Sequence, residues 1–229
     1  MKTIGLIGGM SWESTVPYYE IINRETNRAL GKNRSAKIVL YSFDFEAIEE
    51  LQYAGRWDEL RRLILDAGMK LKNAGADFAV LCTNTMHKVA GDFESEVGIP
   101  LLHIARAVGE KVREKGIERV GLLGTKFTME ENFYRQILED AFRLEVLIPG
   151  EEDRKIVNST IYGELVKGIV REESKKEYER IMDRMKEGGA EGIILGCTEI
   201  GLLIKNYNLP IFDSAEIHAR QAVMMSLAE

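Results

Sequence analysis

The feature of this sequence that most restricts its fold is that the second half repeats the pattern of the first. Short apolar runs rich in β-branched residues alternate with longer amphipathic stretches, a pattern typical of an α/β protein with a mainly parallel sheet. Three pairs of segments match in the same order: Ile4–Gly9 with Val120–Thr125, Gly75–Thr83 with Gly189–Cys197, and Ile99–His103 with Leu209–Asp213. We therefore predict two pseudo-symmetric halves, although unrelated β-to-α turns can also look alike.

The same alternation predicts the individual elements. Strands are expected near residues 3–8, 37–43, 77–82, 100–103, 119–124, 144–148, 191–196 and 209–212. Helices are expected near residues 13–30, 57–74, 84–94, 104–115, 128–142, 151–169, 172–188 and 214–227. Residues 1–100 with 210–229 would form one three-layer α/β half and residues 101–209 the other, with the active site in the cleft between them.

Composition narrows the class of protein. The 229 residues are 45% hydrophobic and 30% charged, as in ordinary globular proteins. No apolar run approaches the roughly 20 residues of a membrane helix, and the first residues enter a strand-like segment directly. We therefore expect a cytoplasmic protein without a signal peptide or membrane contact. A net charge of −6 without a long basic run argues against nucleic acid as a partner.

Cofactor and metal motifs are missing from the sequence. Two cysteines, Cys82 and Cys197, form no disulfide framework in a chain of this size. Neither Cys-x-x-Cys nor His-x-x-x-His spacing occurs, so we expect no metal site. The Gly5-x-x-Gly8-Gly9 run departs from the dinucleotide fingerprint, and no Walker lysine follows it. We expect a protein that works without a cofactor.

Thr83 and Cys197 occupy equivalent places in the repeat, each after an apolar strand and before an expected helix. Because open parallel sheets bind ligands outside the carboxyl ends of their strands, two halves packed face to face would place these residues on opposite walls of one cleft. A helix N-terminus should lower the pKa of the Cys197 thiol, although free cysteines are also common as small buried hydrophobes. Cys82 should point away from Thr83, into the core.

Polar residues follow both positions and are candidate binding groups. Backbone N–H groups at a helix N-terminus hold carboxylates well, but ordinary N-capping residues would give the same pattern. Glu199 could also bind an ammonium group or tune the thiol, or simply be a solvated first-turn residue. The candidates are Asn84, Thr85, Thr198 and Glu199.

Three further positions border the same turns. Gly8–Ser11 should form a tight turn, with Ser11 capping the next helix. Its counterpart in the second half, Gly124–Thr128, would offer the Thr128 hydroxyl to the same ligand. His87 lies one helical turn after Thr83 and is expected to be a packed or capping residue.

The segments Met1–Thr15, Leu81–Lys88 and Leu195–Gly201 resemble the aspartate/glutamate racemase superfamily. Within it they are most similar to the broad-specificity amino-acid racemase branch of the aspartate racemases, and the likeness runs along essentially the whole chain. The resemblance implies a cofactor-independent, usually dimeric racemase built from two pseudo-symmetric α/β halves. It also implies two cysteines acting on opposite faces of the substrate α-carbon.

Residue by residue, Cys197 matches the second of these cysteines. Thr83 stands where the first is usual, which is what the broad-specificity branch shows. A lysine of the aspartate-specific members aligns with Val166, and Lys167 is one place late, so aspartate preference is not secured. The resemblance implies substrate contacts at Met10, Gln52, Asn84, Thr85 and Thr198.

Our interpretation is a pyridoxal-independent amino-acid racemase, of aspartate or broad specificity, acting as a homodimer. Cys197 would remove the α-proton from one face, and Thr83 would supply a proton to the other. Two alternatives stay open. A one-cysteine decarboxylase or isomerase of a small dicarboxylate would use Cys197 alone, and a non-catalytic relative would only bind amino acids.

Overall fold

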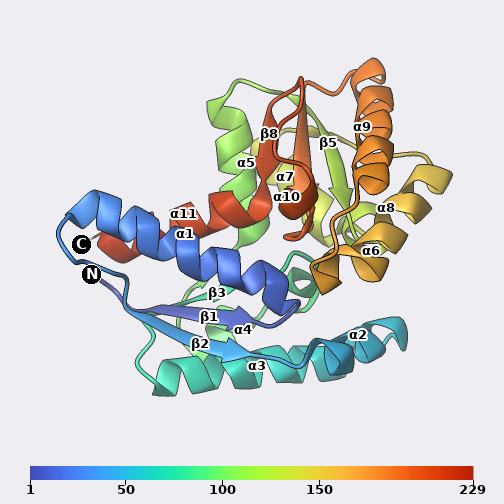
Figure 1. The fold of residues 1–229 in the computed structure, drawn as a ribbon. Helices are drawn as coiled ribbons and strands as arrows, with labels where there is room; N and C mark the ends of the chain where they lie inside the picture. Colours follow the sequence, from blue (N-terminus) through green and yellow to red (C-terminus); the bar gives the residue numbers. More distant parts are fainter. Residues whose placement is uncertain (229) are drawn as a thin grey trace. The chain divides into compact units, whose positions relative to one another are not determined.

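Two compact units make up the protein (Figure 1). The computed structural model describes residues 1–228; unit 1 comprises residues 1–103 and those from 218 onward, and unit 2 comprises residues 104–217. Each unit holds a four-stranded sheet in which every neighbouring pair is parallel. The strand orders, β2-β1-β3-β4 and β6-β5-β7-β8, are equivalent. The predicted pair of parallel α/β halves is confirmed.

All eight expected strands form, within about two residues of their predicted bounds. The middle strands of each sheet are buried almost throughout and read as continuous apolar runs, whereas the edge strands are partly exposed. Unit 1 contains β1 (Ile4–Gly8), β2 (Ile38–Ser42), β3 (Phe78–Leu81) and β4 (Leu101–Leu102); unit 2 contains β5 (Arg119–Gly124), β6 (Glu145–Leu147), β7 (Gly192–Gly196) and β8 (Ile211–Asp213).

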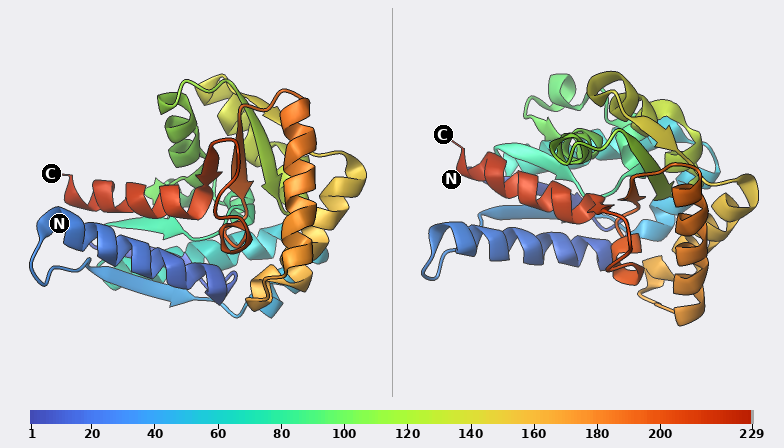
Figure 2. Two further views of the ribbon diagram at one scale, coloured as in Figure 1. Left: turned by 45° about the horizontal axis from the view of Figure 1, so that its top comes forward. Right: turned by 90° about the horizontal axis from the view of Figure 1, so that it is seen from above.

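Helices cover both faces of the unit 1 sheet. Figures 1 and 2 show α1 and the C-terminal part of α11 side by side on one face, and Figure 1 shows α3 on the other. A buried apolar cluster that includes Ile7, Ile64 and Leu81 joins α3 to the sheet. The helices are α1 (Trp12–Leu30), α2 (Phe45–Tyr53), α3 (Trp57–Asn73), the 3₁₀ helix η1 (Thr85–Val89), α4 (Phe93–Val97) and the later residues of α11 (Ser214–Leu227).

Unit 2 is layered in the same way around two apolar clusters. One cluster packs α5 and α7 against the sheet, and the other packs α8 and α9 against its opposite face. No helix among residues 1–228 is long and apolar enough to cross a membrane. The helices are α5 (Ile104–Glu114), α6 (Lys126–Glu130), α7 (Asn132–Phe142), α8 (Glu151–Gly163), η2 (Leu165–Lys167), α9 (Glu172–Glu187), α10 (Ile200–Leu203) and the start of α11.

Three predicted helices are interrupted. Residues 84–94 form η1 and the start of α4 instead of one continuous helix. Residues 128–142 divide between α6 and α7 because Glu131 is extended, with φ −93° and ψ 158°. The helix expected to end at 169 ends at Gly163, before a separate 3₁₀ turn. Helix α2, whose first turn is capped by the Asp44 side chain, was not predicted.

The boundary between the units also differs from the expected one. Strand β8 hydrogen-bonds to β7, so residues 210–217 belong to unit 2 and not to the first half. Helix α11 therefore starts in unit 2 and ends in unit 1.

The shared strand order gives each sheet a switch point. In each unit the connections from the two middle strands lead to opposite edges of the sheet. Ligands of such sheets bind at this switch point, between the two middle strands.

Tyr134 provides a test of the unit 2 core. This side chain on α7 is fully buried, and its hydroxyl has no hydrogen-bond partner among the described residues. An unsatisfied buried hydroxyl costs about 1–3 kcal/mol, so Tyr134→Phe should raise the free energy of unfolding by about 1 kcal/mol in urea titrations followed by circular dichroism.

Tyr178 is the matched control, since it is equally buried and donates to the Val157 carbonyl at 3.0 Å. Tyr178→Phe should lower the free energy of unfolding by about 1 kcal/mol, because it removes a buried hydrogen bond. Equal losses in both variants would contradict the assignment of Tyr134.

Candidate active site

The turn after β1 is held by a threonine one helical turn further on. Gly9 has φ +83°, and a Cβ here would collide with the Phe43 carbonyl oxygen. Its N–H donates to Thr15 Oγ1 at 2.9 Å, and that hydroxyl donates to the Ser11 carbonyl, also at 2.9 Å. Ser11 occupies the N-cap position of α1, but its side chain makes no capping hydrogen bond. The predicted capping role of Ser11 is wrong, and Thr15 organises the turn.

The turn after β3 places Thr83 beside this first turn. The Cys82 N–H donates to the Ile7 carbonyl at 2.9 Å and extends the β1–β3 pairing by one residue. The Thr83 N–H turns back to the Leu81 carbonyl at 2.8 Å. Cys82 is fully buried, which confirms its predicted place in the core, and burial raises the pKa of its thiol. Thr83 is also buried, with 7% of its surface exposed.

The residues that follow Thr83 form only a single turn. Helix η1 is a five-residue 3₁₀ helix, and Asn84 precedes it without a side-chain capping bond. The prediction of a longer helix here is therefore wrong. A single turn carries little dipole, so it attracts a carboxylate less than the expected helix would. Asn84 and Thr85 are almost completely buried. Their contacts with substrate stay predictions.

Two other predicted contacts of unit 1 are also buried. Met10 is 3% exposed and belongs to the apolar cluster under α3. Gln52, on α2, is 4% exposed, and its Nε2 donates to Met86 Sδ at 3.3 Å. Because η1 carries Met86, this contact joins α2 to the turn that follows Thr83. A role of either residue in substrate binding stays a prediction.

His87 anchors the Thr83 main chain. Its Nδ1 lies 2.8 Å from the Thr83 carbonyl oxygen and donates to it, since a carbonyl can only accept. The ring centroid is 4.4 Å from that of His103 and 6.1 Å from that of His218. Burial, followed by the two neighbouring histidines, lowers the pKa of His87 well below its ordinary value. Of the two roles expected for His87, packed or capping, the packed one is confirmed by its burial.

In unit 2, the turn after β5 lies against the end of β7. A Cβ on Gly124 would lie 2.8 Å from the Gly196 carbonyl oxygen, so the glycine permits this close approach. Thr125 caps α6 by accepting from the Thr128 N–H at 3.3 Å. Thr128 is fully buried, with its hydroxyl 3.2 Å from that of Thr125. Thr128 thus stabilises the turn, and its contact with a ligand stays a prediction.

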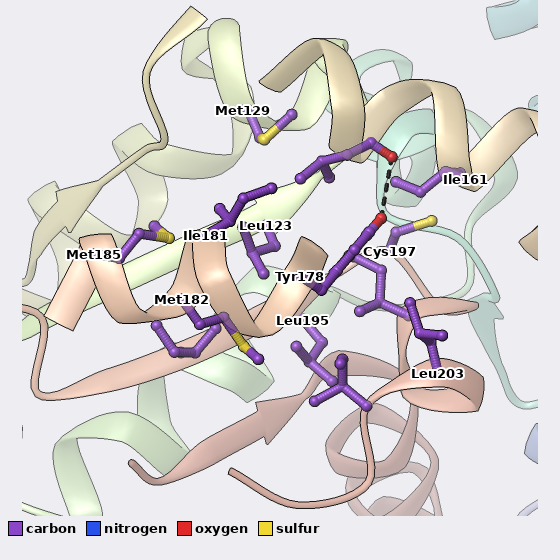
Figure 3. Packing of buried hydrophobic residues seen from close by; sticks show 14 of the residues in the cluster. Leu123, Met129, Ile161, Tyr178, Ile181, Met182, Met185, Leu195, Cys197 and Leu203 are labelled. Atoms are coloured by element: carbon purple, nitrogen blue, oxygen red, sulfur yellow. Dashed lines mark hydrogen bonds between the residues drawn. The ribbon is translucent and has the colours of Figure 1, made fainter. Parts of the chain in front are cut away.

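Cys197 follows β7 directly and contacts a buried carboxylate. Its Sγ donates to Glu199 Oε2 at 3.0 Å, and the Thr198 hydroxyl donates to the same oxygen at 2.8 Å. Glu199 is 2% exposed and Cys197 is 7% exposed. Figure 3 shows the cysteine beside the Tyr178 ring, within the apolar cluster of α8 and α9. Of the alternatives for Glu199, tuning of the thiol fits this contact.

The pKa of Cys197 is raised well above its ordinary value, opposite to the expected direction. Burial is the largest cause, and the charge and the hydrogen bond of Glu199 act in the same sense. The backbone N–H groups of Glu199 and Thr198 oppose the rise only in part. The following helix, α10, spans four residues, too few for the dipole on which the expectation rested.

The raised pKa keeps the Cys197 proton on sulfur, with the Glu199 carboxylate as its hydrogen-bond acceptor. Transfer to Glu199 Oε2 would create a thiolate without exposing either group to solvent, and a thiolate is the reactive form of cysteine.

Among residues 1–228, no three His, Cys, Asp or Glu side chains gather as a metal site would require.

Comparison with known proteins gives the family. The family model described as Asp/Glu/Hydantoin racemase matches residues 7–222. The chain belongs to this racemase family. Racemases are isomerases, and this family works without pyridoxal phosphate, so the chain falls in the class of pyridoxal-independent isomerases.

Three relatives illustrate the similarity. A protein of known structure from Yersinia pestis, described as a candidate Asp/Glu racemase, is 49% identical over the whole of both chains, with a TM-score of 0.91. An aspartate racemase homologue from Pyrococcus horikoshii OT3 is 35% identical over the whole of both chains, with a TM-score of 0.85. The broad specificity amino-acid racemase RacX of Bacillus subtilis (strain 168) is 23% identical over 98% of each chain.

Some supporting residues had no signal in the sequence. Tyr18 and His218 lie 200 residues apart, yet the Tyr18 hydroxyl is 2.9 Å from His218 Nδ1. Nothing local to either residue indicates this pairing. Thr15 is different, because its spacing of four residues from Ser11 at the start of an amphipathic stretch is where a helical side chain reaches back to the preceding turn.

Glu199 can be tested through the reactivity of the thiol it contacts. Glu199→Gln removes a negative charge that raises the pKa of Cys197, so the midpoint of the iodoacetamide rate against pH should fall. The measurement is made with Cys82→Ser in the background, so that only Cys197 reacts. Glu179→Gln, remote in sequence and partly exposed, serves as the control. An unchanged or higher midpoint in Glu199→Gln would refute the assigned coupling.

Proposed function

We propose that this chain is a cofactor-independent amino-acid racemase that interconverts L- and D-amino acids by two-base proton transfer at the α-carbon. Membership of the racemase family supports the reaction class. The observation that carries the mechanism is the hydrogen bond from Cys197 Sγ to Glu199 Oε2, 3.0 Å long and buried. It supplies a thiol with an adjacent proton acceptor at the strand end equivalent to that of Thr83.

In the first step, the Cys197 thiol passes its proton to Glu199 Oε2, and the resulting thiolate removes the α-proton from one face of the substrate. The C–H electron pair stays on the α-carbon as a carbanion. In the second step, the Thr83 hydroxyl gives its proton to the opposite face of that carbon. Glu199 then releases its proton to water, and Thr83 is reprotonated from water. Every group returns to its starting state.

The carbanion needs strong stabilisation, because the α-hydrogen of an amino acid is a very weak acid. Fixed donors in a site that excludes water are the most effective means. Asn84, Thr85 and Thr198 are buried polar residues next to the two proton-transfer groups in sequence. We assign them to the substrate carboxylate. Met10, Gln52 and Thr128 would complete the contacts.

The substrate is aspartate or a wider range of amino acids. The Pyrococcus relative is described as an aspartate racemase homologue and RacX as a broad-specificity enzyme. At the place where aspartate-specific members have a lysine, this chain has Val166, which packs against the unit 2 core, while Lys167 is exposed. Broad specificity is therefore favoured. A homodimer is the assembly that the family resemblance implies.

One feature favours a second candidate function. Thr83 stands where a cysteine would supply the second thiol, so a one-cysteine enzyme acting on a small dicarboxylate would need Cys197 alone. Incubation in D₂O with a panel of L- and D-amino acids separates the possibilities. A racemase exchanges the α-proton and inverts the centre, a decarboxylase releases carbon dioxide, and a protein that only binds amino acids does neither.

Cys197 is the first residue to test. Cys197→Ser should reduce racemisation by more than about 100-fold, because a serine hydroxyl is a far weaker acid than a thiol and general acid–base catalysis contributes about 10²–10⁴-fold. Polarimetry measures the rate, and thermal unfolding checks the fold. Cys82→Ser is the matched control, since Cys82 is the other buried cysteine, and should keep most of the activity. Similar activity in both variants would remove Cys197 from the mechanism.

Thr83 is predicted to act in only one of the two proton transfers. Thr83→Ala should lose racemisation but retain slow α-proton exchange, with retention of configuration, for the enantiomer whose α-hydrogen faces Cys197. Thr83→Cys should restore racemisation at or above the parent rate, because a thiol titrates much nearer the working pH than a hydroxyl. Proton NMR in D₂O measures both quantities. Normal racemisation by Thr83→Ala would favour a one-base mechanism.

A further inference from the structure

The two repeats support their reactive residues in different ways. In unit 2, the residue two places after Cys197 is Glu199, which bonds the thiol directly. The equivalent residue in unit 1 is Thr85, which offers no carboxylate. Support for Thr83 comes instead from His87, four places on, whose ring bonds the Thr83 main chain. No imidazole has this role in unit 2, where the residue four places after Cys197 is a glycine.

The backbone of Thr83 is held at both its N–H and its carbonyl group. Its N–H donates to the Leu81 carbonyl at 2.8 Å, and its carbonyl accepts from His87 Nδ1, also at 2.8 Å. Threonine is β-branched and has few χ1 choices. A rotation of the Thr83 backbone therefore moves the hydroxyl with it, and whatever holds the backbone restricts where Oγ1 can lie.

His87 packs against two further histidine rings, those of His103 and His218. His218 Nε2 donates to the Leu102 carbonyl at 2.9 Å, which leaves its Nδ1 to accept from the Tyr18 hydroxyl at 2.9 Å. The His103 ring lies at 4.4 Å from His87, centroid to centroid. Burial lowers the pKa of His218 to about 3, so the His218 ring is uncharged at neutral pH.

We propose that His87 is a positioning residue for Thr83: by donating from Nδ1 to the Thr83 carbonyl, it aims the threonine hydroxyl at the substrate α-carbon. The inference rests on the function proposed above and extends it to a residue that touches neither the substrate nor the reacting atoms. A displacement of about 1 Å in a catalytic group can cost about 100-fold in rate, and a rotated Thr83 peptide would displace Oγ1 on that scale.

Two substitutions separate the donor from the rest of the side chain. His87→Phe keeps a ring of similar size but removes the donor, whereas His87→Asn keeps an N–H close to the position of Nδ1. Racemisation by His87→Phe should fall about 100-fold in kcat, with KM within about threefold of the parent. His87→Asn should stay within about tenfold of the parent. Loss of activity in His87→Asn as severe as in His87→Phe would overturn the positioning role.

The stereochemistry of exchange distinguishes positioning from a general structural role. In D₂O, His87→Phe should behave like Thr83→Ala: inversion is lost, while exchange with retention persists for the enantiomer that faces Cys197. A residue that only stabilised the fold would reduce exchange from both enantiomers together. Equal loss for both enantiomers would therefore contradict the proposal, as would a His87→Phe variant with the parent kcat.

Failure of the underlying function gives a different result. If the parent protein exchanges no α-proton from any amino acid in the panel, the proposed racemase activity is wrong, and the positioning role falls with it. If the parent is active, the tautomer of His87 tests the geometry independently. Imidazole ¹⁵N shifts should show Nδ1 protonated and Nε2 unprotonated, and the opposite tautomer in an active parent would overturn the positioning role alone.

Discussion

The parallel pairing of the two middle strands in each unit is the constraint on which the candidate site depends. Register aligns Ile7 with Leu81 in unit 1 and Gly124 with Gly196 in unit 2. The turns after paired strands must then emerge side by side. The strand order places the switch point of each sheet between these two turns. Thr83 and Cys197 occupy these places because the strands before them are apolar and buried throughout.

Burial of a thiol against a carboxylate is unfavourable unless each satisfies the other. Glu199 is almost fully enclosed, and both the Cys197 thiol and the Thr198 hydroxyl donate to one of its oxygens. The arrangement keeps the proton on sulfur and raises the pKa of the thiol, whereas an exposed helix N-terminus would lower it. The Cys197 thiol is therefore held in its protonated, less reactive form, with a carboxylate as its hydrogen-bond acceptor.

The sequence predicts the fold better than it predicts the environment of the site. Strand positions follow from apolar runs, and the repeat correctly indicates that Thr83 and Cys197 are equivalent. The direction of the Cys197 pKa shift could not be predicted, because it depends on the brevity of α10 and on how Glu199 folds back toward the sulfur. The pairing of Tyr18 with His218 could not be predicted either, since it joins residues 200 apart in the sequence.

Unit 1 is discontinuous, and this affects how the chain can fold during synthesis. Unit 2 is one continuous stretch, whereas unit 1 needs the segment from residue 218 onward. This segment contacts the start of the chain: the Lys2 N–H donates to the Ser226 carbonyl, and Arg220 forms an ion pair with Glu25. Domains generally fold as units while the chain leaves the ribosome, and contacts between distant residues form slowly. Unit 1 can therefore be completed only after all of unit 2 has been synthesised, because its last segment follows unit 2 in the sequence.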